Sequence, residues 1–255
     1  MFSIFNEGLY ISVFNSFNFS QNQAYMYPVT LIIAILIVGV GAYLLGSINS
    51  AIIVSRLFFR EDVRSQGSGN AGTTNVMRSY GKKAAIFTLL GDMLKTVIAI
   101  LFGGLVLGLN YAGYGFSYGY GGYIAAFACV LGHVYPIFYG FKGGKGVLCL
   151  ATAVLMLSPI ALVLLFLVFI LIVAFTKYVS LGSVVGALLY PILLNRLIVL
   201  LGPVVTQEGN VVPLDGVQTL ISMLLGLFIA FCHRENIKRL MRGEEHKFSF
   251  HSKKK

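Results

Sequence analysis

The chain has 255 residues, of which 57% are hydrophobic and only 11% are charged, and its mean hydropathy is +0.84. Soluble globular domains carry about 25% charged residues, so this composition excludes a soluble domain and indicates an integral membrane protein. The net charge of +10 favours contact with anionic lipid headgroups, an explanation that requires no specific ligand and no nucleic acid.

Three regions are expected along the chain. Residues 1–27 contain no Lys or Arg and lack the basic start of a signal peptide, so we expect an extracytoplasmic N-terminal segment. Residues 28–240 are expected to form a single polytopic membrane domain, since no hydrophilic block is long enough to fold alone. Residues 241–255 are expected to form a basic cytoplasmic tail.

A helix that crosses a bilayer needs about 20 mostly apolar residues. By this criterion the sequence predicts an all-α membrane fold with about seven transmembrane helices, at residues 28–55, 84–108, 120–138, 147–157, 160–176, 180–201 and 217–232. The stretch 147–176 can be one helix kinked at Pro159 or two short helices. Because proline disrupts the hydrogen bonds of a helix interior, Ser158-Pro159 favours a turn.

Cationic residues alternate between the predicted loops. Segment 56–83 carries six Lys or Arg residues, segment 140–146 carries two and segment 233–255 carries eight, whereas loops 109–119 and 202–216 carry none. The positive-inside rule therefore predicts an N-terminus outside and a C-terminus in the cytoplasm. This arrangement needs an odd number of spans, which supports seven, or five if some of the segments do not cross.

The first polar loop, 64–83, combines glycines, hydroxyls and cations between two apolar segments. Residues 67–72 match G-x-G-x-x-G, but a dinucleotide site needs a preceding strand, and here the neighbours are predicted membrane helices. A glycine-rich turn is the structural alternative. The functional interpretation is an anion cradle, because glycines let backbone N–H groups converge. Its donors would be Ser68, Thr73, Thr74 and Asn75, with Arg78 as the counter-charge.

The second polar loop follows His133 and contains Gly143-Gly144-Lys145-Gly146. It is not a P-loop, because Tyr139 stands where the first glycine belongs and Gly146 replaces the Ser or Thr that binds magnesium. A flexible turn with two lysines can still bind a phosphate. A lone histidine such as His133 is more often a hydrogen-bonded structural residue than a catalyst.

Two further segments lie on the same predicted membrane face. Tyr178–Ser183 reads as a helix cap when taken alone, and its position favours a share in the site. His233–Leu240 reads as an amphipathic juxtamembrane helix.

Within the membrane, Asp92 and Lys95 are three residues apart and can pair, either structurally or in function. Arg196 has no clear role. No metal cluster, carboxylate pair, Ser-His-Asp order or H-x-x-x-x-D acyltransferase base is found in the sequence.

Taken together, these segments resemble the bacterial membrane-embedded glycerol-3-phosphate acyltransferases that use acyl phosphate. Four stretches carry the resemblance: GSGNAGTTNVMR at 67–78, GHVYPIFYGFKGGKG at 132–146, SLGS at 180–183 and HRENIKRLMRGEE at 233–245. The resemblance covers about residues 28–245 and implies seven transmembrane helices in the bacterial plasma membrane, with the active site at the cytoplasmic face. It implies acyl transfer from acyl phosphate to the 1-hydroxyl of glycerol 3-phosphate, which yields lysophosphatidate and phosphate in the first step of phospholipid synthesis.

The resemblance also implies the site residues. Catalytic roles would fall to Ser68, Arg78, Lys145, Ser183, His233 and Asn236, with Lys142 as the alternative to Lys145. Substrate binding would involve Gly67, Gly69, Asn70, Gly72, Thr74, Asn75, Lys142, Gly143, Gly144 and Ser180. The two substrates and membrane lipids are the expected partners, no metal or cofactor is expected, and a monomer is expected.

Two other classes fit parts of the sequence. A transporter or channel for a phosphorylated or anionic solute would also need a cationic inner pocket, but the chain lacks an inverted repeat and outer cations to receive the solute. A lipid-binding scaffold would need only the charges and not the dense Ser, Asn, Thr and Gly loops.

Overall fold

The computed structural model describes residues 26–108, 110–112, 115–117, 119–201, 204–205, 211–212 and 216–247. The predicted N-terminal segment 1–27 lies almost wholly outside these residues, as does the end of the predicted tail. The helices are α2 (Met26–Ser47), α3 (Ser50–Phe59), α4 (Thr73–Tyr80), α5 (Lys82–Leu107), α6 (Gly119–Val134), α7 (Val147–Leu157), α8 (Pro159–Thr176), α9 (Val179–Leu201), α10 (Gly216–Cys232) and α11 (Arg234–Met241), with short 3-10 turns η2 (Val63–Ser65) and η3 (Ile137–Tyr139).

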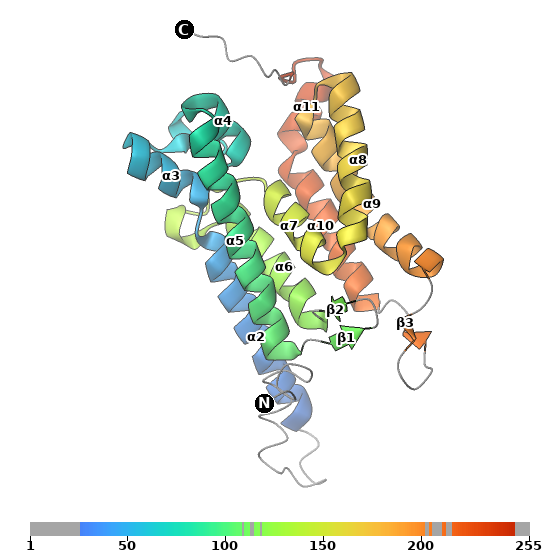
Figure 1. Ribbon diagram of the computed structural model, residues 1–255. Helices are drawn as coiled ribbons and strands as arrows, with labels where there is room; N and C mark the ends of the chain where they lie inside the picture. The colour runs from blue at the N-terminus through green and yellow to red at the C-terminus, as the bar shows by residue number, and fades with distance from the viewer. Residues whose placement is uncertain are drawn as a thin grey trace.

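Two small antiparallel hairpins complete the described structure: β1 (Asn110–Ala112) pairs with β2 (Gly115–Ser117), and β3 (Val204–Val205) pairs with β4 (Val211–Val212). In Figure 1 the hairpins lie at the end of the molecule opposite to α3, α4 and α11. The polar loops predicted to form the site adjoin those helices, so they gather at one end.

Each of the seven predicted segments contains a helix, which confirms an all-helical membrane fold. Four helical stretches are long and apolar enough to cross a membrane, and a fifth passes if α10 and α11 are one span bent by 57°. The shorter helices include α7, with 11 residues. Seven spans and the orientation of the termini therefore stay predictions.

Local sequence explains where two predicted spans end early or divide. The predicted helix 28–55 is broken after Ser47, because Asn49 adopts an extended conformation and accepts a hydrogen bond from the Ile52 amide at 3.1 Å. Asn49 thereby caps α3 and starts a second helix. The stretch 147–176 is two helices, and Pro159 is the first residue of α8, where its missing N–H costs no hydrogen bond.

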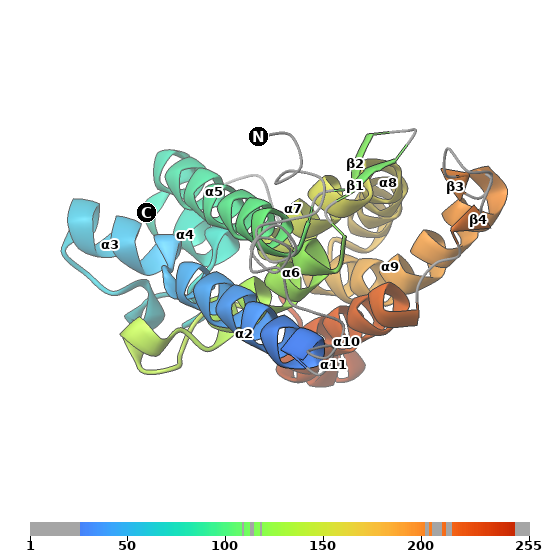
Figure 2. The same ribbon diagram turned by 90° about the horizontal axis from the view of Figure 1, so that it is seen from below.

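The helices form two groups. Helices α2, α5 and α6 pack on one another, and α8, α9 and α10 form the second group, with α7 against both α5 and α8. Figure 2 shows the two groups as opposite flanks of the molecule. Contacts between α6 and α10 join the groups.

Glycines set the closest helix crossings. A Cβ on Gly132 of α6 would collide with the Tyr43 carbonyl of α2, and one on Gly46 would collide with the Cys129 carbonyl. Small residues allow membrane helices to approach this closely, where van der Waals packing replaces the hydrophobic effect. By contrast, α8 buries only Ala161 and Leu165 and exposes large side chains such as Phe166, as expected of a lipid-facing helix.

Candidate active site

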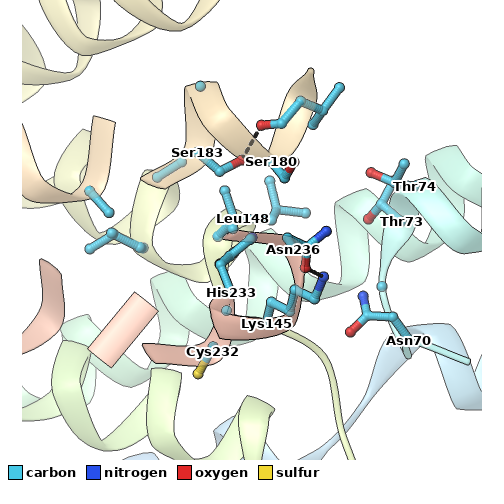
Figure 3. A pocket seen from close by; sticks show the side chains of 18 of the residues that line it. Asn70, Thr73, Thr74, Lys145, Leu148, Ser180, Ser183, Cys232, His233 and Asn236 are labelled. Carbon is cyan, nitrogen blue, oxygen red and sulfur yellow. Dashed lines mark hydrogen bonds between the residues drawn. The ribbon is translucent and has the colours of Figure 1, made fainter. Parts of the chain in front are cut away.

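A cavity of about 950 Å³ opens where the polar loops meet. Its polar lining comes from the 68–78 segment, the 143–146 loop, the first turn of α9 and the α10–α11 junction with the following chain, as Figure 3 shows for representative side chains. Its apolar lining comes from α7, α8 and α9, including Leu148, Leu165 and Phe169. Four segments far apart in the sequence therefore meet around one space.

The structure brings most of the predicted site residues to this cavity. All six predicted catalytic residues line it: Ser68, Arg78, Lys145, Ser183, His233 and Asn236. The predicted substrate-binding residues that line it are Gly69, Asn70, Gly72, Thr74, Asn75, Gly143 and Ser180. Whether these residues act in catalysis or binding stays a prediction.

Three predicted residues are not among those that line the cavity. Lys142 is exposed, and its carbonyl accepts a hydrogen bond from Nη1 of Arg64 at 3.1 Å. Gly144 is buried against His133. Gly67 is exposed with φ of +56°, and a side chain there would also collide with Oδ1 of Asn75. These glycines shape the loops and do not face the cavity.

Asn75 holds the glycine-rich loop in place from the inside. Its amide donates to the carbonyls of Val63 at 3.1 Å and Gln66 at 2.9 Å, and its Oδ1 accepts from the Ser68 amide at 2.9 Å. The loop leads into α4, whose first residues have no side-chain cap. Uncapped N–H groups at a helix start attract anions, and here they belong to residues that line the cavity.

Arg64 connects the glycine-rich loop to the lysine loop. Its Nη1 donates to the Tyr139 carbonyl at 2.7 Å as well as to that of Lys142, and its Nη2 pairs with Asp62 at 2.8 Å. The hydrogen bond from Arg64 holds the pKa of Asp62 well below its usual range. This charged pair therefore fixes the two loops relative to each other.

A polar network centred on Glu245 closes the other side of the cavity. Lys145 Nζ donates to Oδ1 of Asn236, as Figure 3 shows, and the Asn236 amide donates to Glu245 Oε1 at 2.7 Å. The Ser180 hydroxyl donates to the same oxygen at 2.9 Å, and Arg239 Nε donates to Oε2 at 2.8 Å. Glu245 and Arg239 were not predicted as site residues. No local sequence signal shows that the chain after α11 returns to α9.

Burial and neighbouring groups shift the pKa values of Lys145 and Glu245 in this network. Burial lowers the pKa of Lys145, and the nearby guanidinium of Arg239 lowers it further. Burial acts to raise the pKa of Glu245, but hydrogen bonds from Asn236, Arg239 and Ser180 outweigh it and leave the pKa below its ordinary value. A phosphate bound beside Lys145 would act against both effects that lower its pKa and would favour the charged ammonium.

Two other predicted residues are oriented by backbone carbonyls. His233 is buried at the junction of α10 and α11, and its Nδ1 lies 2.8 Å from the Ile229 carbonyl. Because a carbonyl only accepts, Nδ1 carries the proton, and Nε2 of the neutral ring is an acceptor. Ser183 donates to the Val179 carbonyl at 2.9 Å within α9.

Two residues outside the predicted set of site residues also line the cavity, namely Asp92 and His133. The predicted pairing of Asp92 with Lys95 is confirmed, with 2.9 Å between Oδ1 and Nζ.

The side chain of Arg196 lies outside what the structure describes. Within the described ranges, no group of three or more His, Cys, Asp or Glu side chains is placed to hold a metal ion.

Comparison with known proteins gives consistent matches over most of the chain. The family model described as "Glycerol-3-phosphate acyltransferase" matches residues 33–243. A glycerol-3-phosphate acyltransferase of Clostridioides difficile (strain 630) is 40% identical over 219 residues, which are 85% of this chain and 96% of that protein.

Two solved structures have a similar fold. The crystal structure of PlsY (YgiH), an integral membrane glycerol 3-phosphate acyltransferase, in its glycerol 3-phosphate form has a TM-score of 0.69 and 34% identity, and the match covers 84% of this chain and 96% of that chain. Its lysophosphatidic acid form has a TM-score of 0.67 and 32% identity, with 84% and 95% covered.

Proposed function

The chain belongs to the glycerol-3-phosphate acyltransferase family, an assignment that confirms the resemblance noted from its sequence, and from this premise we propose the finer reaction. The acyl donor is acyl phosphate, the acceptor is the 1-hydroxyl of glycerol 3-phosphate, and the products are lysophosphatidate and inorganic phosphate. The enzyme acts at the cytoplasmic face of the bacterial plasma membrane, as the first step of phospholipid synthesis.

This proposal rests on one observation: a single cavity has both a polar, cationic lining and an apolar lining. The glycine-rich loop, the start of α4 and Lys145 offer N–H donors and cations for phosphate groups. Leu148, Leu165 and Phe169 offer an apolar wall between helices, where an acyl chain needs no polar partner. A phosphorylated acceptor and an acyl phosphate together require both surfaces.

The reaction needs no enzyme nucleophile, because phosphate is already a good leaving group. The acceptor hydroxyl oxygen attacks the acyl carbonyl, a new ester C–O bond forms, and the bond between the acyl carbon and the phosphate oxygen breaks. The hydroxyl proton passes to a substrate phosphate oxygen. Holding the two substrates in this geometry can supply up to about 7–11 kcal/mol of the barrier.

The six residues predicted to be catalytic each have a proposed role in that step. Arg78 and Lys145 clamp the phosphates and offset the repulsion between two anionic substrates. Ser68 and Ser183 orient the phosphates, and His233 with Asn236 holds the pocket in shape. We propose that the protein acts as a monomer.

The test uses purified protein in detergent with glycerol 3-phosphate and palmitoyl phosphate, and with palmitoyl-CoA as the parallel donor. We expect lysophosphatidate and phosphate in equal amounts from palmitoyl phosphate and no product from palmitoyl-CoA. Product from palmitoyl-CoA alone would contradict the proposed donor and leave the family assignment intact. If folded protein gives no product from either donor, uptake of the phosphorylated solute into liposomes tests the transporter alternative.

A further inference from the structure

Three ionisable side chains outside the proposed set of catalytic residues form a buried cluster beneath the cavity. Asp92, Lys95 and His133 are 1%, 5% and 4% exposed. Asp92 and Lys95 belong to α5, and His133 belongs to the last turn of α6. Buried charges are costly unless they are paired and hydrogen-bonded, so the arrangement of their partners shows what the cluster holds.

Lys95 ties α5 to the end of α2. Its Nζ donates to the Gly46 carbonyl at 3.0 Å and to the Ile48 carbonyl at 2.8 Å. Carbonyls in the last turn of a helix have no partner within the helix. The ammonium satisfies the Gly46 carbonyl of that last turn and the Ile48 carbonyl just after it, where the chain leaves α2 and turns toward α3 and the glycine-rich loop.

The same ammonium determines the protonation of His133. Nζ of Lys95 lies 3.0 Å from Nδ1 of His133 and 2.9 Å from Oδ1 of Asp92, which is 3.7 Å from Nδ1. An ammonium group has three N–H donors and no acceptor, so its four neighbours share three hydrogens, and Nδ1 can face the ammonium only as an acceptor. The proton of the neutral imidazole is then on Nε2, and the Asp92 carboxylate balances the charge of Lys95.

The opposite edge of the His133 ring faces the meeting point of two loops. A Cβ added to Gly144 would collide with Nε2 of His133 and would lie 2.7 Å from the Ala71 carbonyl. The His133 carbonyl accepts from the Gly144 amide at 3.1 Å, and the Cys149 thiol is a further polar neighbour of the ring. His133 therefore contacts the lysine loop directly beside the glycine-rich loop.

We propose that Asp92, Lys95 and His133 form a positioning unit for acyl transfer, which holds the loops 67–72 and 143–146 at the spacing that receives the two substrates. The unit acts through a neutral His133 with its proton on Nε2. This inference rests on the proposed function, because the spacing matters only for a reaction between two phosphorylated substrates. Asp92 and His133 also line the cavity, which places the unit directly under that space.

The first test separates positioning from folding. Removing both charges in a D92N/K95M double variant avoids leaving one charge buried alone, so the protein is expected to fold. The double variant lacks the hydrogen bonds of Lys95 to the Gly46 and Ile48 carbonyls and its contact with His133. We expect KM for glycerol 3-phosphate to rise and kcat/KM to fall about 10²-fold, the cost of a misplacement near 1 Å.

Thr88→Val is the matched control, because Thr88 is buried one turn earlier on α5, bonds only to the Ala84 carbonyl and does not line the cavity. The double variant should melt close to this control in detergent while differing from it in KM. A double variant with the kinetic constants of Thr88→Val would overturn the proposal. Absence of acyl transfer by the unsubstituted protein would instead remove the proposed function.

The second test needs no activity. The chain has four histidines, and replacing His233, His246 and His251 by Asn leaves His133 as the only one. Nitrogen-15 NMR of the labelled protein should show a neutral ring with the proton on Nε2 at neutral pH. A proton on Nδ1, or a doubly protonated ring, would overturn the proposal even if the double variant fails to fold.

Discussion

The two lysines of the 140–146 loop differ in what they reach, although the sequence treats them as alternatives. Lys145 lines the cavity and donates to Asn236, whereas Lys142 is exposed and contributes a backbone carbonyl to Arg64. The spacing of the two lysines in a glycine-rich loop does not predict which of them faces the cavity, because glycine permits several backbone conformations. The contacts of the folded loop make that distinction.

Lys145→Met should therefore lower kcat/KM for acyl transfer by about 10²–10³-fold, the scale of losing one preorganised charged donor. Lys142→Met is the matched control and should stay within about threefold of the unsubstituted protein, since Lys142 is exposed and is not among the residues that line the cavity. Both are measured by lysophosphatidate formation under saturating acyl phosphate. Equal losses in the two variants would contradict the distinction.

Glu245 is the residue that connects α9, α11 and the chain after α11. Its pKa is lowered, so its carboxylate stabilises the folded state fully above the ordinary pKa of 4.5. That contribution is lost as the pH falls through the lowered pKa. We expect the melting temperature in detergent to be steady above pH 4.5 and to fall below it.

Glu245→Gln provides the comparison for this pH effect. The amide cannot accept the charged hydrogen bonds of Arg239 in the same way, so the variant should be less stable at neutral pH. Its melting temperature should approach that of the parent as the pH decreases. A constant difference at every pH would show that Glu245 does not titrate with folding.

At the scale of elements, helix contacts depend on a few glycines, and the apolar pattern alone does not show which. Gly132 and Gly46 let α6 and α2 approach to backbone contact, whereas a Cβ on Gly39 of the same α2 would meet nothing within 4 Å. The helices themselves follow from hydrophobic stretches, but a single-sequence pattern does not show which face meets a neighbour.

Gly132→Val should destabilise the protein by about 1–3 kcal/mol or more, because the added side chain overpacks the α2–α6 crossing. Gly39→Val is the matched control and should change stability by less than about 1 kcal/mol, since its side chain has open space. Thermal unfolding in one detergent measures both. A Gly132→Val protein as stable as Gly39→Val would contradict the observed crossing.

At the scale of the whole molecule, the charged loops and the cavity share one end, and the hairpins lie at the other, as Figure 1 shows. The positive-inside rule predicts that the charged end faces the cytoplasm. Four helical stretches are long and apolar enough to cross a membrane, and a fifth is if α10 and α11 form one span. The predicted side of each terminus can be tested by labelling.

Single cysteines test this orientation in intact cells, in a chain with Cys232→Ala, since Cys129 and Cys149 are buried. Gly216→Cys lies at the start of α10 and Lys247→Cys lies after α11, and both positions are exposed. A membrane-impermeant thiol reagent should label Gly216→Cys in intact cells and Lys247→Cys only after lysis. The reverse pattern would invert the predicted topology.

The sequence by itself determined the membrane class, the helical composition and the four segments that meet at the cavity. These properties follow from apolar content and from local motifs such as GSGNAGTTNVMR, which are readable without knowing what lies nearby. Only the tertiary structure decided that Lys145 and not Lys142 faces the cavity, and that Glu245 joins the network with Ser180. It also brought Lys95 to the end of α2 and to His133. The contacts of Lys95 with Gly46 and His133 and of Lys145 with Asn236 join residues 38 to 91 positions apart. A buried charge or a free carbonyl selects such a distant partner only when packing brings the two together.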